Sequence, residues 1–213
     1  MELKGKKINF LGDSITEGVG TSCADGMFVN IIKKEAELAE ARNYGVSASR
    51  IARQWLNEGE SPEPRDYCER FEEMDDDADV IVVFGGTNDY GHGNADFGGD
   101  SDRGVHTYCG AVHYLMEGLI RKYPAAEIVF LTPIHREDET IRNMHGRVLK
   151  DYVDEIKIAA EQYSLPVLDM FSMGGIYPQL EVQKKALCPD GLHPNDAGNA
   201  RIAQRIISFL RSL

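Results

Sequence analysis

Four polar stretches, far apart in the chain, hold residue types that could act together in acyl transfer. The first is FLGDSITEG (10–18), in which Asp13 and Ser14 directly follow an apolar run. A serine hydroxyl is a weak nucleophile unless a general base accepts its proton and a further group orients that base. Taken alone, the stretch leaves two interpretations open: Ser14 is a nucleophile, or Ser14 or Asp13 caps a short helix.

A candidate base and its orienting acid occur together in CPDGLHPNDAG (188–198). Asp190 and His193 are three residues apart, a separation that can place both side chains on one face of a turn. A catalytic pair and a purely structural Asp–His turn both fit this pattern. The stretch precedes the last expected helix, at the same predicted edge of the fold as Ser14.

Donors for the oxyanion of an acyl-transfer intermediate are expected in the two remaining stretches. FGGTNDYG (84–91) places Asn88 four residues beyond the most apolar strand, and NYGVSAS (43–49) contains Gly45, whose N–H no side chain shields. Asn and Gly are also common in ordinary turns, so neither residue alone distinguishes an oxyanion donor from turn chemistry.

In their order along the chain, these four stretches resemble the conserved blocks of the SGNH hydrolases, also called GDSL esterases and lipases. The resemblance extends from residue 10 to residue 195. It implies a three-layer α/β/α fold, flavodoxin-like, with a five-stranded parallel sheet. The second block departs from the family pattern N-x-G-x-x-G, because Ala48 stands at the last glycine.

The resemblance also implies a mechanism that needs neither a metal nor a cofactor. Ser14 would attack an ester carbonyl, His193 would take its proton, and Asp190 would orient the imidazole. The oxyanion would be bound by the N–H groups of Ser14 and Gly45 and by the amide of Asn88. Asp13 is expected to stabilise the turn or cap the helix rather than serve as the acid of the triad.

The elements that would position these residues alternate between strands and helices. Strands are expected at 7–11, 79–84, 127–132 and 166–170, and helices at 27–41, 50–58, 65–74, 106–123, 147–164 and 196–213. This order favours a largely parallel sheet with helices on both faces, whose ligands bind beyond the carboxyl ends of the strands. Three long loops (85–106, 133–146 and 171–195) follow strands and are therefore candidates for the site.

The composition narrows the class of protein. With 213 residues and no linker, the chain is expected to form one domain, 1–213. A formal net charge of −12 argues against binding to nucleic acid or to an anionic membrane surface. The short apolar stretch near the start predicts neither a signal peptide nor a membrane span, so a cytoplasmic protein is expected. Four widely spaced cysteines suggest reduced, mostly buried thiols.

The expected substrate is a small-molecule ester with a short acyl group, with acetylated carbohydrate preferred. Arylesterase, thioesterase and lysophospholipase activities of the same family are the alternatives. From other classes, a metal-dependent phosphoesterase is disfavoured because neither D-x-H near the start nor H-x-H occurs, and an inactive binding module because every catalytic position is filled. Residues expected to line the pocket are Tyr90, His92 and His135.

Overall fold

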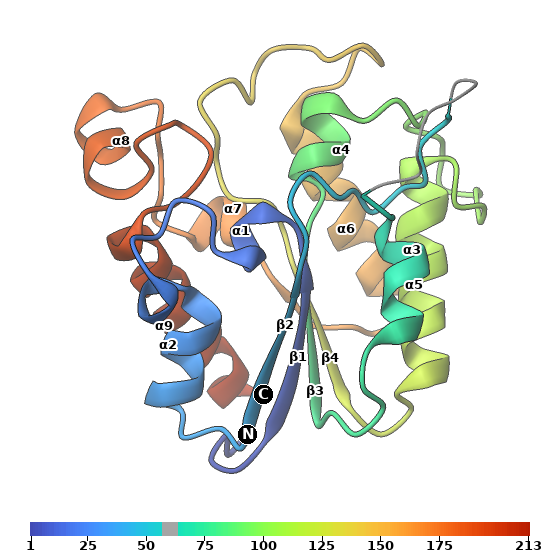
Figure 1. Ribbon diagram of the computed structural model, residues 1–213. Coiled ribbons are helices and arrows are strands. Elements are labelled where there is room, and N and C mark those ends of the chain that lie inside the picture. The colour runs from blue at the N-terminus through green and yellow to red at the C-terminus, as the bar shows by residue number, and fades with distance from the viewer. Residues whose placement is uncertain (57–63) are drawn as a thin grey trace.

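A five-stranded parallel sheet forms the centre of the computed structural model, which describes residues 1–56 and 64–213 (Figure 1). The spatial order is β2-β1-β3-β4-β5, the strand order of flavodoxin-like folds. The strands are β1 (Lys7–Gly12), β2 (Glu40–Gly45), β3 (Val80–Phe84), β4 (Glu127–Leu131) and β5 (Val167–Leu168).

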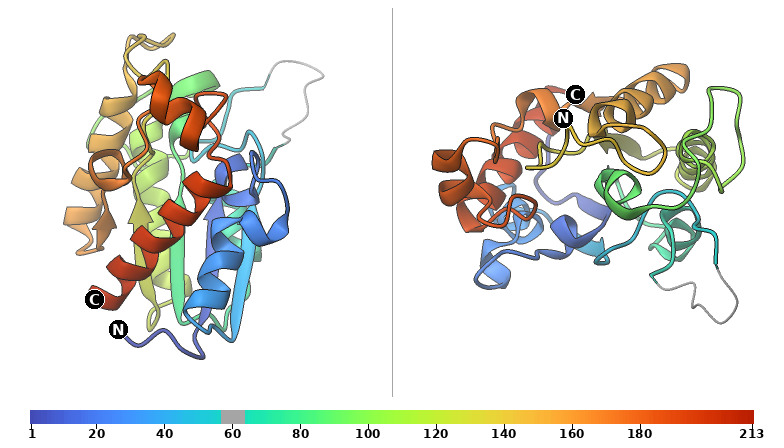
Figure 2. Two further views of the ribbon diagram at one scale, coloured as in Figure 1. Left: turned by 90° about the vertical axis from the view of Figure 1, so that its left-hand side faces the viewer. Right: turned by 90° about the horizontal axis from the view of Figure 1, so that it is seen from above.

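Helices cover both faces of the sheet and complete three layers (Figures 1 and 2). One face carries α2 (Phe28–Glu35) and α9 (Asp196–Ser212), and the other carries α3 (Tyr67–Arg70), α5 (Tyr108–Lys122) and α6 (Leu149–Gln162). The predicted three-layer α/β/α fold with five parallel strands is therefore confirmed.

Strand β3 shows why this sequence builds a sheet buried on both faces. All five of its residues are buried, and β-branched residues make up most of the run VIVVF. Alternate side chains enter different cores: Ile81 and Val83 pack with α5 and α6, whereas Val80, Val82 and Phe84 pack with α2 and α9. Two apolar cores thus hold the sheet rigidly between the helices.

Short helices gather at the carboxyl ends of the strands, where open α/β sheets bind ligands (Figure 1). They are α1 (Ser14–Glu17), α4 (Thr87–His92), α7 (Met170–Met173) and α8 (Glu181–Leu187). Two 3₁₀ turns, Ala24–Gly26 and Phe71–Glu73, complete the elements of the described residues. Both chain termini lie at the opposite end of the sheet.

Strand β2 corrects the prediction of one helix over 27–41. The helix ends at Glu35, Glu37 takes a left-handed φ of 52°, and the chain then pairs with β1 from Glu40 onward. The sequence EARNYG gives no strand signal because β2 is an edge strand whose residues are only partly buried.

The helix predicted at 50–58 is also wrong for its described part. Residues 50–56 form no helix, because the N–H groups of Ile51 and Ala52 donate to the carboxylate of Asp89 instead. Residues 57 and 58 lie outside the described part of the chain. The helix predicted at 65–74 is divided into α3 and a 3₁₀ turn.

The long loops at 85–106 and 171–195 contain α4, most of α7, and α8. The four cysteines are free thiols, and three are buried, as predicted; Cys23 is exposed. Among the described residues, no helix combines the length and the apolar character that crossing a bilayer requires.

Candidate active site

The serine corner, residues 12–18, joins β1 to α1 and fixes Ser14 through the backbone. Asp13 caps α1, its Oδ1 accepting a hydrogen bond from the N–H of Ile15 at 2.9 Å, which confirms the predicted turn and capping role. Gly18 ends the helix with a left-handed φ of 103°. Ser14 is the first residue of this four-residue helix and keeps only 6% of its surface exposed.

The histidine loop, residues 188–195, brings the predicted base to the serine. The Nε2 of His193 lies 2.9 Å from the Oγ of Ser14, and its Nδ1 lies 2.7 Å from the Oδ2 of Asp190. The other oxygen of Asp190 accepts from the N–H groups of Leu192 at 2.9 Å and His193 at 2.7 Å. The acid is therefore oriented by the same loop that carries the imidazole.

These contacts assign the proton on the imidazole. A carboxylate can only accept, so Nδ1 of His193 carries the hydrogen that faces Asp190. The neutral ring then presents the lone pair of Nε2 to the hydroxyl of Ser14. This is the arrangement that a general base requires if it is to take a proton from an attacking serine.

The pKa values of Asp13 and Asp190, the two acids near Ser14 and His193, are shifted in opposite directions. Burial raises the pKa of Asp13 to about 7, against the opposing hydrogen bond from Ile15. Burial also works to raise the pKa of Asp190, but hydrogen bonds from the backbone and ring of His193 and from Leu192 outweigh it and lower that pKa. Asp190 is consequently the acid that stays ionised beside the imidazole.

Asn88 lies on α4 with its side-chain amide buried and held at both ends. Its Nδ2 donates to the carbonyl of Ser49 at 3.0 Å, and its Oδ1 lies 3.1 Å from the Nε2 of His92. Next to it, Asp89 accepts from Ile51 and Ala52, and burial raises its pKa to about 6. Helix α4 and the segment 49–52 are thereby locked together.

The structure does not support Gly45 as an oxyanion donor. This residue ends β2 rather than standing in a turn, and its N–H already donates to the Oδ1 of Asn43 at 2.8 Å. A Cβ at this position would lie 2.1 Å from the backbone nitrogen of Glu17. Glycine is therefore needed here because β2 and α1 pack backbone to backbone, and not because it offers a free donor.

A free donor occurs three residues later, at Ala48. This exposed residue takes a left-handed φ of 62°, an uncommon conformation for a side chain other than glycine. Within residues 1–56 and 64–213, the N–H of Ala48 has no acceptor, and the same holds for the N–H of Ser14. On either side, Ser47 is bonded to Glu17 and Ser49 to Asn88, so the turn bridges α1 and α4.

Arg70 is a supporting residue that the sequence does not reveal. Its buried guanidinium donates to the Oγ of Ser49 at 2.9 Å and to the carbonyls of Gly12 and Tyr44. It therefore ties the ends of β1 and β2 to the turn that carries Ala48. A cation bonded mainly to backbone carbonyls has no recognisable spacing in the sequence, which explains why it was not predicted.

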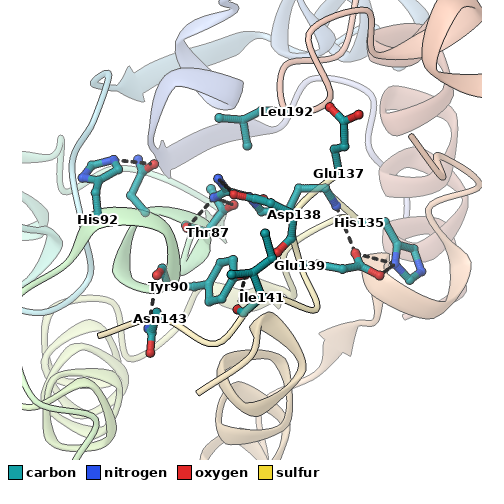
Figure 3. Close-up of polar contacts among 12 residues, drawn as sticks. Thr87, Tyr90, His92, His135, Glu137, Asp138, Glu139, Ile141, Asn143 and Leu192 are labelled. Carbon is teal, nitrogen blue, oxygen red and sulfur yellow. Dashed lines mark hydrogen bonds and ion pairs between the residues drawn. The ribbon is translucent and has the colours of Figure 1, made fainter. Parts of the chain in front are cut away.

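Two of the three predicted pocket residues are committed to other contacts (Figure 3). The hydroxyl of Tyr90 lies within hydrogen-bonding distance of the carbonyls of Asp138 (2.5 Å) and Ile141 (2.7 Å), and the residue is 3% exposed. The ring of His135 packs on Phe171, and its Nδ1 pairs with the Glu139 carboxylate at 2.8 Å. Both residues anchor the loop after β4, so the prediction that they contact substrate is not supported.

That same loop also contacts the histidine loop, which sequence reasoning missed. The N–H of Glu137 donates to the carbonyl of Gly191 at 2.9 Å, and the Glu137 carboxylate pairs with Lys184 at 2.7 Å. Arg136 binds Asp138 and donates to the carbonyl of Thr87 at 3.1 Å. The loop thus connects α4, which carries Asn88, to the loop that carries His193.

The described residues contain no group of three or more His, Cys, Asp and Glu side chains placed so that it could hold a metal ion.

Comparisons with known proteins identify the family and the fold. The model of the GDSL-like lipase/acylhydrolase family matches residues 10–201. No curated protein sequence matches the chain. One solved structure is 30% identical with a TM-score of 0.89, and the match covers 100% of this chain and 99% of the other. A structure from Lactobacillus plantarum is 29% identical with a TM-score of 0.86, covering 99% and 98%.

A more distant likeness is to an acetylxylan esterase from Geobacillus stearothermophilus. The two chains are 20% identical with a TM-score of 0.65, and the match covers 98% of this chain and 95% of the esterase. At this identity the comparison concerns the fold alone.

Proposed function

The chain belongs to the GDSL-like lipase/acylhydrolase family and is a carboxylic ester hydrolase, and from that premise we propose that it hydrolyses short-acyl esters through an acyl-enzyme on Ser14. The observation that carries this proposal is the continuous hydrogen-bonded line from Ser14 through His193 to Asp190, with distances of 2.9 and 2.7 Å.

In the first half-reaction, the Oγ of Ser14 forms a bond to the ester carbonyl carbon while Nε2 of His193 takes its proton. The resulting imidazolium is stabilised by the carboxylate of Asp190. Collapse of the tetrahedral intermediate breaks the bond to the alcohol, which leaves with the proton from His193. In the second half-reaction, His193 activates a water that attacks the acyl-enzyme, and the acid is released with Ser14 restored.

Three donors are proposed for the oxyanion: the N–H of Ser14, an N–H of the Asn88 amide, and the N–H of Ala48. Asn88 bonds only one of its two amide hydrogens to Ser49, which leaves the second for the substrate. The unpaired N–H and left-handed φ of Ala48 support it in place of Gly45. A strained backbone of this kind is common where a site is held ready for its ligand.

Short acyl groups, with acetylated carbohydrate as the preferred substrate, fit the character of the surrounding loops. In the loop after β4, Arg136 donates to the carbonyl of Thr87 and the N–H of Glu137 donates to the carbonyl of Gly191, which places polar groups of this loop beside α4 and the histidine loop. A long hydrocarbon chain would gain little apolar contact there. The acetylxylan esterase of related fold is consistent with this choice.

The proposal is tested with 4-nitrophenyl acetate, butyrate and octanoate, together with acetate release from acetylated xylo-oligosaccharides. We expect the acetyl esters to have the highest kcat/KM. Replacement of Ser14 by Ala should reduce kcat by roughly 10⁴-fold or more, because removal of a triad member leaves only binding and the oxyanion donors. A Ser14→Ala variant with full activity would falsify the mechanism.

The same assays separate the rival functions. Ester hydrolysis that persists in a chelator, with no release of phosphate from 4-nitrophenyl phosphate, supports the serine esterase. Chelator-sensitive phosphatase activity would instead indicate a metal-dependent phosphoesterase. An absence of turnover with every ester would favour a binding module, and fastest hydrolysis of the octanoate would indicate a lysophospholipase-like preference.

A further inference from the structure

Asn88 does not hold its own orientation, because a side-chain amide can rotate by 180° and exchange its oxygen and nitrogen. In the reverse orientation, the amide nitrogen would face the Nε2 of His92 and the oxygen would face the carbonyl of Ser49. The carbonyl of Ser49 can only accept, so the 3.0 Å contact places Nδ2 of Asn88 toward it and leaves Oδ1 facing the Nε2 of His92, 3.1 Å away. Asn88 is 3% exposed, so water cannot replace these partners freely.

The contact with His92 stabilises Asn88 only if Nε2 carries a hydrogen, and Arg50 supplies that condition. Its Nη2 makes a short hydrogen bond to the Nδ1 of His92 and lies 3.4 Å from the carbonyl of the same residue. A guanidinium has five donors and no acceptor, so Nδ1 must accept. A neutral ring with Nδ1 as acceptor carries its single hydrogen on Nε2, which then donates to Oδ1 of Asn88.

Other features of this cluster agree with a neutral ring. Burial, followed by the positive charges of Arg50 and Arg136, lowers the pKa of His92. The ring lies at the end of α4, four residues after Asn88, so both side chains emerge from the same face of the helix. Figure 3 shows His92 turned toward its hydrogen-bond partner on that helix.

We propose that His92 and Arg50 are positioning residues that hold the Asn88 amide with its free N–H directed at the oxyanion. The chain of donors runs from Arg50 to His92 and from His92 to Asn88, while the Ser49 carbonyl receives the amide's other hydrogen. This inference rests on the proposed role of Asn88 as an oxyanion donor. It gives His92 a role distinct from the substrate contact that the sequence suggested.

A double-mutant cycle in kcat tests the inference. Asn88→Ala should reduce kcat by roughly 10²–10³-fold. His92→Ala should reduce kcat by about 5–10-fold with little change in KM, as expected for loss of one hydrogen bond. In the Asn88→Ala background, the same His92→Ala substitution should have no further effect, because there is no amide left to orient.

Two variants serve as controls for this cycle. His92→Gln should recover most of kcat, since its amide can also donate to Oδ1 of Asn88. His106→Ala removes a histidine that stacks on Trp55 at 4.2 Å, away from these contacts, and should leave kcat within about twofold. Thermal unfolding of each variant by circular dichroism establishes that it is folded before its kcat is compared.

A spectroscopic measurement tests the same inference without a rate. In ¹⁵N spectra of the whole protein, the His92 ring, assigned by loss of its signals in His92→Gln, should be neutral with its hydrogen on Nε2. In Arg50→Leu it should become a mixture of tautomers. Hydrogen on Nδ1 in the unmodified protein would overturn the proposal.

The kinetic outcomes distinguish failure of the positioning role of His92 from failure of the oxyanion role of Asn88. If Asn88→Ala lowers kcat while His92→Ala does not, or if the two losses multiply in the double variant, the positioning role is wrong and the oxyanion role of Asn88 stands. If Asn88→Ala leaves kcat unchanged, the proposed oxyanion donor itself is wrong, and the positioning role is rejected with it.

Discussion

The serine corner and the histidine loop each pair a reacting side chain with an acid, but they use the acid in opposite ways. Asp13 is buried, and its carboxylate caps the backbone of α1 beside Ser14. Asp190 keeps 54% of its side chain exposed and bonds the imidazole of His193 directly. A half-exposed carboxylate that accepts from three donors has its pKa lowered, whereas burial raises the pKa of Asp13, which has a single donor, to about 7.

This difference indicates how the two reacting groups are held. Ser14 is fixed by backbone packing: β2 contacts α1 at Gly45, and Arg70 ties the strand ends below. His193 is fixed mainly by hydrogen bonds within its own loop and by the contact of Gly191 with Glu137. The position of Ser14 therefore depends on close backbone packing, and the position of His193 depends on hydrogen bonds to polar and charged groups.

The largest expected effect is on kcat and distinguishes the roles of Asp190 and Asp13. Asp190→Asn should reduce kcat by about 10³–10⁴-fold, because an amide can stabilise the wrong tautomer of His193 and cannot stabilise the imidazolium. Asp13→Asn should change kcat by less than about tenfold, since Asn also caps the helix. The measurement is kcat for 4-nitrophenyl acetate at pH 8. Equal losses in the two variants would show that both acids serve the imidazole.

The next effect is on the free energy of unfolding, to which Asp13 contributes less as the pH rises. A pKa raised from 3.8 to about 7 means that folded Asp13 retains a proton that the unfolded chain has released. The contribution of Asp13 to the free energy of unfolding is therefore complete below about pH 4 and is lost as the pH rises through about 7. Asp13→Asn removes this loss and should be more stable than the unmodified protein at pH 8, by up to ~4 kcal/mol.

Urea unfolding of both proteins from pH 4 to pH 8 measures this difference. Asp89, whose pKa is raised by burial to about 6, has the same direction of effect but is present in both proteins and cancels. Stability curves that run parallel across the whole range would contradict a buried, proton-binding Asp13.

The smallest expected effects are on the free energy of unfolding when one methyl group is added in the tightly packed serine corner or in the histidine loop. Gly45→Ala should lower the free energy of unfolding by about 2–3 kcal/mol, because its Cβ would meet only backbone atoms of α1. Gly191→Ala should cost about 1–2 kcal/mol, mainly because its φ is 81°; the nearest atoms belong to the flexible side chain of Glu137.

The matched control is Gly99→Ala, where nothing lies within 4 Å of the added methyl group. Its free energy of unfolding should change by less than about 0.5 kcal/mol. A larger loss for Gly191→Ala than for Gly45→Ala would reverse the assignment of rigid packing to the serine corner.

Sequence reasoning succeeded where a short motif follows a strand. Ser14 and Asn88 lie in the segments that follow β1 and β3, so the rule that ligands bind at the carboxyl ends of parallel strands places them at one edge. Asp190 and His193 are neighbours in one loop and needed no long-range information. The three-layer fold follows from the same alternation of strands and helices.

The failures concern backbone groups whose N–H is bound by a side chain. Nothing in NYGVSAS reveals that the Asn43 side chain occupies the N–H of Gly45 and leaves that of Ala48 unpaired. Similarly, RIARQWL has a helical pattern, but Asp89 captures two of its N–H groups. The first of these hydrogen bonds is local, and in the second a tertiary contact overrides the local helix propensity.

The hydrogen bond between Ser14 and His193 joins residues 179 positions apart. Closing so large a loop costs entropy before the contact is gained, so we expect this hydrogen bond to form late in folding. The sheet can therefore acquire most of its secondary structure while the serine still lacks its base. Hydrolytic activity should appear only when the segment that carries Asp190 and His193 has docked, so a chain emerging from the ribosome would remain inactive until that segment has been synthesised and folded.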